Sequence, residues 1–153
     1  MKIEEIPIYF NTSIDNDNSI TPLSVNWSPS ADTLLVGLSN NMCLTVDTRK
    51  NLQFKQSFSS HQRSIFGATF VNNNQFISWS SDCSIRLWDA NDTSNETNGT
   101  NTNPIKIYEI QNFPILTAAV DINPTTNKVR VACAGGQSNN FVGSPVYFYK
   151  SFI

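Results

Sequence analysis

The sequence of 153 residues is the length of one ordinary domain, and its 10 Lys and Arg residues against 12 Asp and Glu residues give a formal net charge of −2. This balance argues against a general nucleic-acid-binding surface, because such a surface needs a basic face and the cations here are scattered. Charged residues are only 14% of the chain, and 20 asparagines supply much of its polarity.

The first repeat-like stretch follows a short N-terminal segment. Within residues 1–19 we expect one strand over 3–10 and then a polar lead-in. From Leu23 to Asp47 the chain reads strand, polar turn, strand, turn and strand, with the Ser28-Pro29 pair at the first turn. A further strand-like run covers 52–58, so residues 20–60 are predicted to form one unit of four strands.

The second stretch repeats this order. Strands are predicted around Ala68 and Phe70, over 76–79 and over 85–88, and the run IKIYEI at 105–110 alternates apolar and polar residues with period two. Residues 61–110 are therefore the second unit. Within it, residues 91–103 contain no apolar side chain, and we expect a solvated, disordered loop there.

The third stretch, residues 111–153, has the same order of strands and turns. Strands are predicted over 120–122, 129–133 and 146–149, with a turn at Asn123-Pro124. Its outer strand is missing from the sequence, so we expect a truncated unit. About 42 residues separate Asp47 from Asp89, within the 40 to 45 expected for one blade of a propeller. No window keeps helical spacing of apolar residues, and the chain is predicted to be all-β.

The segment SWSSDCSIRLWD at 78–89 resembles the signature of the WD-repeat β-propeller family. The family pattern has a His that opens the blade, a hydroxyl residue on the second strand, an Asp in the next turn and a strand that ends in Trp-Asp. Five residues occupy these places: His61, Ser78, Asp82, Trp88 and Asp89. The resemblance implies a partial β-propeller of about three four-stranded antiparallel blades, with a buried relay through His61, Ser78, Asp82 and Trp88.

The other two repeats depart from this pattern. Val36 stands in place of the hydroxyl residue, Asn40 in place of the Asp and Val46 in place of the Trp, so the first blade is expected to depend on apolar packing. In the third repeat Tyr149 is the nearest substitute for the Trp. The relay is therefore predicted for the second blade.

Catalytic interpretations of the same residues are weaker. Ser78, His61 and Asp82 suggest a hydrolase, but no GxSxG elbow or comparable context accompanies them. His61 is the only histidine, and no ligand set for a metal surrounds it. Cys133 on a strand is more typical of a buried small hydrophobe than of a redox thiol. We therefore expect no enzymatic activity and no cofactor or metal.

The function that the resemblance implies is a protein-interaction scaffold. The surface that meets other proteins is expected at the end of the blade that carries Gln62, Arg63 and Ser81. An RNA-associated subunit of a larger particle remains an alternative, as does a hydrolase that uses His61. Three blades do not close a ring, so we expect a truncated version of a longer protein, self-association or completion by a partner's blades.

The compartment follows from hydropathy and cysteine usage. No apolar run reaches the roughly 20 residues of a membrane helix, and acidic residues interrupt the N-terminal segment where a signal peptide would be apolar. Cys43, Cys83 and Cys133 form no CxxC pair and are expected to stay reduced. We expect a cytoplasmic or nuclear protein without membrane association and without autonomous nucleic-acid binding.

Overall fold

The computed structural model describes residues 20–93, 96–97, 99–110, 113–126, 128–136 and 147–149. These residues form 13 strands in three sheets and contain no helix. Consequently, no helix that is long and apolar enough to cross a membrane occurs in the described part of the chain. The all-β class predicted from the sequence is confirmed.

The first sheet contains four antiparallel strands in chain order, in the place of the first repeat. They are β1 (Pro22–Trp27), β2 (Thr33–Leu38), β3 (Met42–Asp47) and β4 (Gln53–Ser59). Ser28 begins the first turn, where its hydroxyl accepts a hydrogen bond from the backbone N–H of Thr33 at 3.0 Å. The turn expected at Ser28-Pro29 is therefore confirmed.

The second and third sheets continue the pattern. The second sheet has the antiparallel order β10-β7-β6-β5 and the third has the order β11-β12-β13. Their strands are β5 (Ile65–Phe70), β6 (Gln75–Ser80), β7 (Ser84–Asp89), β10 (Lys106–Glu109), β11 (Ile115–Ile122), β12 (Val129–Gly135) and β13 (Tyr147–Tyr149). Each of these strands covers or overlaps a run that the sequence predicted.

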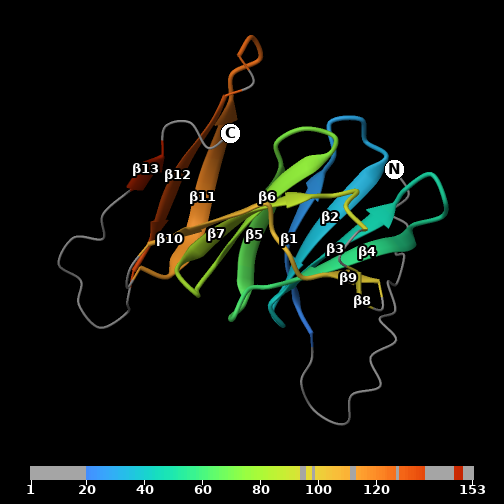
Figure 1. The fold of residues 1–153 in the computed structure, drawn as a ribbon, viewed down its shortest axis with the longest axis horizontal. Helices are drawn as coiled ribbons and strands as arrows, with labels where there is room; N and C mark the ends of the chain where they lie inside the picture. Colours follow the sequence, from blue (N-terminus) through green and yellow to red (C-terminus); the bar gives the residue numbers. More distant parts are fainter. Residues whose placement is uncertain are drawn as a thin grey trace, which may run out of the picture.

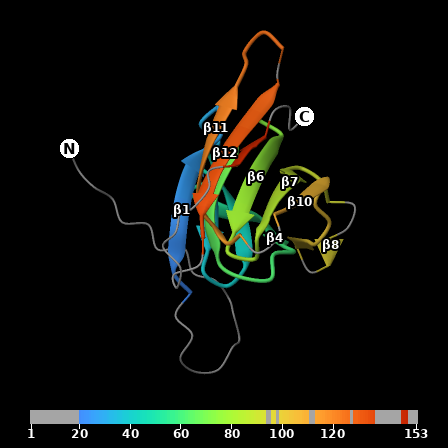
Figure 2. The same cartoon turned by 90° about the vertical axis from the view of Figure 1, so that its left-hand side faces the viewer.

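The three sheets lie side by side in chain order, as the change of colour from blue through green to orange shows (Figure 1). They form an open arc and not a closed ring, which is the arrangement of a partial propeller. The β11–β12 hairpin extends beyond the other sheets in both views (Figure 2).

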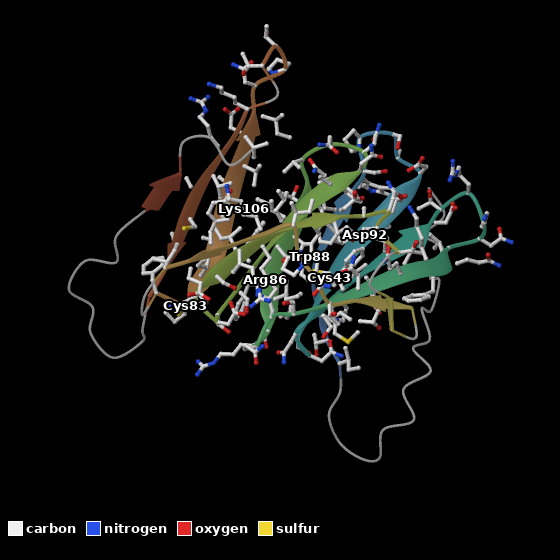
Figure 3. All side chains as sticks on the ribbon, viewed as in Figure 1. Cys43, Cys83, Arg86, Trp88, Asp92 and Lys106 are labelled. Carbon is white, nitrogen blue, oxygen red and sulfur yellow. The ribbon has the colours of Figure 1, made fainter. Side chains whose placement is uncertain are left out.

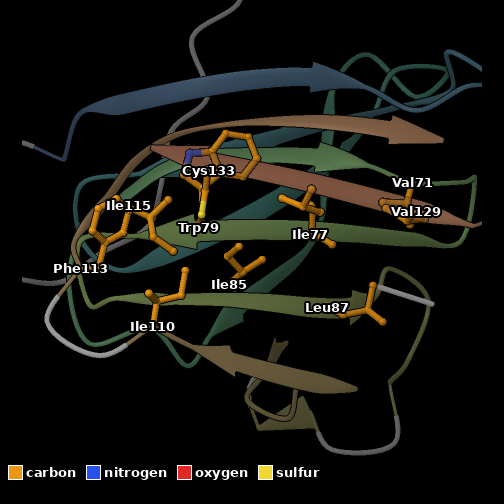
Figure 4. Close-up of a cluster of buried hydrophobic side chains, with 11 residues drawn as sticks. Val71, Ile77, Trp79, Ile85, Leu87, Ile110, Phe113, Ile115, Val129 and Cys133 are labelled. Carbon is orange, nitrogen blue, oxygen red and sulfur yellow. The ribbon is translucent and has the colours of Figure 1, made fainter. Parts of the chain in front are cut away.

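Apolar side chains fill the two spaces between neighbouring sheets. The first space holds Phe58, Phe76 and Trp88, whose rings contact each other, with the Phe58 and Phe76 centroids 4.8 Å apart in an edge-to-face arrangement. The second space is drawn in Figure 4 and holds these buried residues: Val71, Ile77, Trp79, Ile85, Leu87, Ile110, Phe113, Ile115, Val129, Val131 and Cys133. Each sheet therefore packs on the next through one face, as blades do.

The segment expected to be a solvated, disordered loop contains two short strands in its described part. Here β8 (Glu96–Thr97) and β9 (Thr100–Asn101) form a hairpin, and β9 pairs in parallel with the free edge of β4. Asn101 is 1% exposed, and its amide donates to the backbone carbonyl of Asp92 at 3.0 Å. A polar segment can be ordered by hydrogen bonds to an open sheet edge, which apolar content does not predict.

Several expectations concern residues that lie outside the described ranges. They are the strand predicted over 3–10 and the polar lead-in that follows it to residue 19. The first sheet also leaves apolar side chains of β1 open, since Val25 is 65% exposed and Trp27 is 55% exposed. Self-association or completion by a partner's blades stays a prediction that this single chain does not test.

Candidate functional site

The four residues of the relay, His61, Ser78, Asp82 and Trp88, lie together in the second sheet. Asp82 Oδ2 lies 2.8 Å from His61 Nδ1, and His61 Nε2 lies 2.8 Å from Ser78 Oγ. The indole N–H of Trp88 donates to the same Ser78 oxygen at 2.9 Å. The chain of contacts thus runs from the loop before β5, through β6, to β7.

The direction of these hydrogen bonds follows from the chemistry of each group. An ionised carboxylate only accepts, so Nδ1 of His61 carries the proton that faces Asp82. Nε2 of a neutral imidazole then accepts from the Ser78 hydroxyl, which itself accepts from Trp88. Burial lowers the pKa of His61 although Asp82 opposes this effect, which favours the neutral ring.

Asp82 is the centre of the site because several donors converge on it. Its Oδ2 accepts from the backbone N–H of Gln62 at 2.9 Å, and its Oδ1 accepts from the Ser84 hydroxyl at 2.6 Å. Burial by itself would raise the pKa of Asp82, but the hydrogen bonds from His61, Ser84 and Gln62 outweigh it and hold this pKa well below its ordinary value. The carboxylate is therefore ionised and fully occupied as an acceptor.

Arg86 is a further member of the cluster that the sequence analysis missed. Its guanidinium donates to Ser60 Oγ and to Ser84 Oγ and lies 3.5 Å from Asp82 Oδ2, although the residue is only 7% exposed. Burial lowers the pKa of Arg86, and Asp82 and Glu109 oppose this effect. Arg86 and Ser84 could have been predicted from the sequence. Side chains alternate between the two faces of a strand, so residues two and four positions before Trp88 lie on the same face of β7 as Trp88.

The groups of the relay are buried and hydrogen-bonded to one another. Ser78 is fully buried, and its hydroxyl oxygen lies within hydrogen-bond distance of both the Trp88 indole and the His61 imidazole. Burial raises the pKa of the Cys43 and Cys133 thiols, which disfavours thiolate chemistry. Across the described ranges, no three His, Cys, Asp or Glu side chains gather as a metal site would require.

Other residue types occupy the positions of the first sheet that are equivalent to the relay. The pairing Val36↔Leu44 corresponds to Ser78↔Arg86, which puts Val36 at the place of Ser78. Asn40 occupies the turn in place of Asp82, and its buried Oδ1 has no hydrogen-bond partner. Cys43 of this sheet packs with Trp88 across the space between the two sheets, near the centre of the molecule (Figure 3).

The three residues predicted to face a partner lie beside the relay. Gln62 and Arg63 follow His61 directly and are exposed, while Ser81 precedes Asp82 and is half-buried. The Ser80 hydroxyl donates to the backbone carbonyl of Arg63 at 2.9 Å, and the Ser81 N–H donates to that of Ser64 at 3.3 Å. The loop and the turn are thus tied together, and their outer side chains share one end of the second sheet.

Known proteins resemble the chain in sequence and in fold. No model of a protein family matches the sequence. Restriction of telomere capping protein 1 of Candida dubliniensis is 35% identical over 97 residues, which are 60% of this chain and 9% of that protein. The chain therefore spans a small part of the curated relative that it matches.

Solved structures give the clearer comparison. The structure of U3-55K matches 84% of this chain with a TM-score of 0.61 and 17% identity, over 34% of its own length. The WD40 repeats of RRP9 and a chain of the mitotic checkpoint complex each match 82% with a TM-score of 0.59, over 36% and 35% of their lengths. Together with the relay and the three sheets, these matches identify the fold of the chain as that of a WD-repeat β-propeller, of which it contains about three blades.

Proposed function

We propose that the chain is a non-catalytic WD-repeat module that binds other proteins. The observation that carries the proposal is the contrast between buried and exposed side chains around Asp82. The reactive groups of the relay are buried and bonded to each other, whereas the neighbouring Gln62 and Arg63 side chains are exposed on a loop that the same hydrogen bonds hold. A rigid, hydrogen-bonded loop with outward side chains suits the binding of another protein and does not suit catalysis.

The burial of the relay supports the absence of catalysis in this proposal. A serine hydrolase needs an accessible nucleophile and an oxyanion site beside it. Ser78 is 0% exposed, and its hydroxyl is bonded on both sides. Its place in the fold supports a role in tying β6 to β7 and to the loop at His61.

The compartment proposed for the module is the cytoplasm or the nucleus. Cys43, Cys83 and Cys133 are all unpaired, which suits a reducing environment. The relative named for telomere capping favours the nucleus among these two.

Capture of proteins from the source cells with the full chain tests the proposal. Arg63→Glu reverses an exposed charge at the proposed binding end, and we expect it to remove at least one protein that the unmodified chain retains. Arg130→Glu is the matched control, because Arg130 is 64% exposed on the projecting β11–β12 hairpin. If both variants retain the same proteins, or if hydrolysis is detected that Ser78→Ala abolishes, the proposal is wrong.

A further inference from the structure

The hairpin of β8 and β9 pairs outside its own blade. It lies in the chain between β7 and β10 of the second sheet, yet β9 pairs in parallel with β4 of the first sheet, Ser57 with Thr100 and Phe58 with Asn101. Figure 1 shows both short strands beside β4. With them the first sheet has six strands, and its outer two come from the insertion at residues 91–103 of the second repeat.

Ser57 makes the main-chain contact of this pairing. Its backbone N–H donates to the carbonyl of Gly99 at 3.2 Å. Its hydroxyl lies 3.2 Å from the same carbonyl oxygen and 2.7 Å from Thr100 Oγ1. The N–H of Ser57 thus points outward from β4, to the side where a further strand is added, and the insertion takes up this donor.

Two buried amides hold the start of the insertion. The Gln56 and Asn101 side chains, which are 2% and 1% exposed, both donate to the backbone carbonyl of Asp92, at 2.7 Å and 3.0 Å. Lys55 Nζ donates to Asn91 Oδ1 at 2.9 Å. Every residue of β4 from 55 to 58 therefore contacts or pairs with the insertion.

The insertion contains no apolar side chain, so hydrogen bonds and not apolar burial hold it in place. Ordering a polar segment of this length costs conformational entropy that no buried apolar surface offsets. These bonds satisfy an open sheet edge, whose unpaired N–H and C=O groups otherwise attract strands of other chains. The new outer strand, β8, has only 2 residues, and so short a strand offers little to pair with.

The outer strands of the other two sheets differ from β4. β4 has 7 residues with one charged side chain, Lys55, and the neighbouring Phe54 is 53% exposed. β10 has 4 residues, of which Lys106 and Glu109 are charged, and β13 has 3 residues. Short or charged edge strands resist pairing with other chains, whereas a longer strand with an exposed ring does not. The insertion thus covers the outer strand that most needs cover.

A second copy of the chain is the partner that fits this edge when it is open. Two copies related by a twofold axis present the same edge to each other, and antiparallel pairing of β4 with β4 satisfies the outward Ser57 N–H of both. We propose that the insertion at residues 91–103 is an internal edge guard, which occupies the outer edge of β4 and so prevents two copies of the chain from joining through it. This inference does not depend on the proposed function, since Arg63 and its loop take no part in it.

Sedimentation velocity of the full chain at increasing concentration tests the proposal. The release variant replaces residues 96–101 with alternating Gly and Ser, which keeps the length of the connection but makes it a flexible linker. We expect self-association of this variant to begin at a concentration about tenfold or more below that of the unmodified chain. If the release variant associates no more readily than the unmodified chain, the inference is wrong.

Ser57→Pro in the release variant identifies the surface through which copies associate. Proline removes the outward N–H of β4, and proline is tolerated on an edge strand at such a position. We expect this second change to return self-association to the level of the unmodified chain. Association that persists would occur through another surface and would overturn the inference.

Thr102→Gly with Asn103→Ser is the matched control, because both residues are exposed in the same insertion. The control should sediment as the unmodified chain does, and association equal to that of the release variant would contradict the proposal. Gln56→Ala with Asn101→Ala is a milder release variant, which removes both amide donors to the Asp92 carbonyl. It decides the result if the first release variant fails to fold by circular dichroism.

Discussion

The indole of Trp79 lies so close to Gly67 that position 67 has no room for a side chain. A Cβ atom on Gly67 would lie 2.0 Å from Cζ2 of Trp79 and 2.3 Å from its Cε2. The two residues are directly paired between β5 and β6, so the indole lies across the backbone of the neighbouring strand. Phe66, which the register shift leaves out of the ladder between these strands, directly precedes Gly67.

Gly67→Ala is therefore expected to destabilise the chain by about 2 kcal/mol, in the range of overpacked cores. The free energy of unfolding is measured by urea denaturation. In a Trp79→Leu background the ring is absent, and the same change should cost markedly less. Additive effects of the two changes would show that the ring does not oppose a side chain at position 67.

Trp88→Ala should lower the free energy of unfolding by about 3–5 kcal/mol. The change removes a ring that is 1% exposed and leaves the Ser78 oxygen without its indole donor. Val46 stands at the equivalent position of the first blade and has no hydrogen-bonding side chain, so Val46→Ala should cost less. Denaturant melts of both variants check the difference, and equal costs would contradict an organising role for the relay.

Asp82→Asn should cost about 3 kcal/mol, as expected when a buried charge network loses one partner. The amide keeps the shape of the side chain but replaces one acceptor oxygen with a donor that faces other donors. Asp121→Asn is the control, because that carboxylate is 59% exposed and pairs with Arg130 at the surface. A similar cost for both variants in urea would mean that the donors around Asp82 do not depend on its charge.

Stability should fall as the pH drops below the ordinary His pKa of 6.5. Burial lowers the pKa of His61, so the unfolded chain takes up a proton at a higher pH than the folded chain does. The stabilisation is complete above 6.5 and is lost as the pH falls towards the folded pKa. Because His61 is the only histidine, His61→Gln should flatten the curve between about pH 6.5 and pH 5 in urea melts. An unchanged slope in the variant would assign it to other groups.

The chain should not bind generic RNA or DNA at physiological salt. Its net charge of −2 opposes phosphate, and its cations form no basic face. Filter binding at about 0.15 M salt checks this expectation. Retention of RNA at sub-micromolar protein concentration would favour the RNA-associated alternative instead.

The sequence by itself predicted most of the strands from local rules, and its resemblance to the WD-repeat family predicted the relay. Alternation and turn residues such as Ser28-Pro29 mark strands at short range, and the spacing of His61, Ser78, Asp82 and Trp88 belongs to one repeat. Even the correspondence of Val46 with Trp88 could be read from the repeat, and the pairing register agrees with it.

Only the tertiary structure decided what depends on contacts between repeats. The pairing register shifts at Leu23, Phe66 and Leu116, and no composition rule locates such shifts. Asn101 is buried because β9 pairs with the free edge of β4. The Ser57 hydroxyl donates to the backbone carbonyl of Gly99, which lies 42 residues further along the chain. Hydrogen bonds to a sheet edge that is distant in sequence order this polar segment, which has no apolar side chains to bury. Local sequence rules do not predict such pairing.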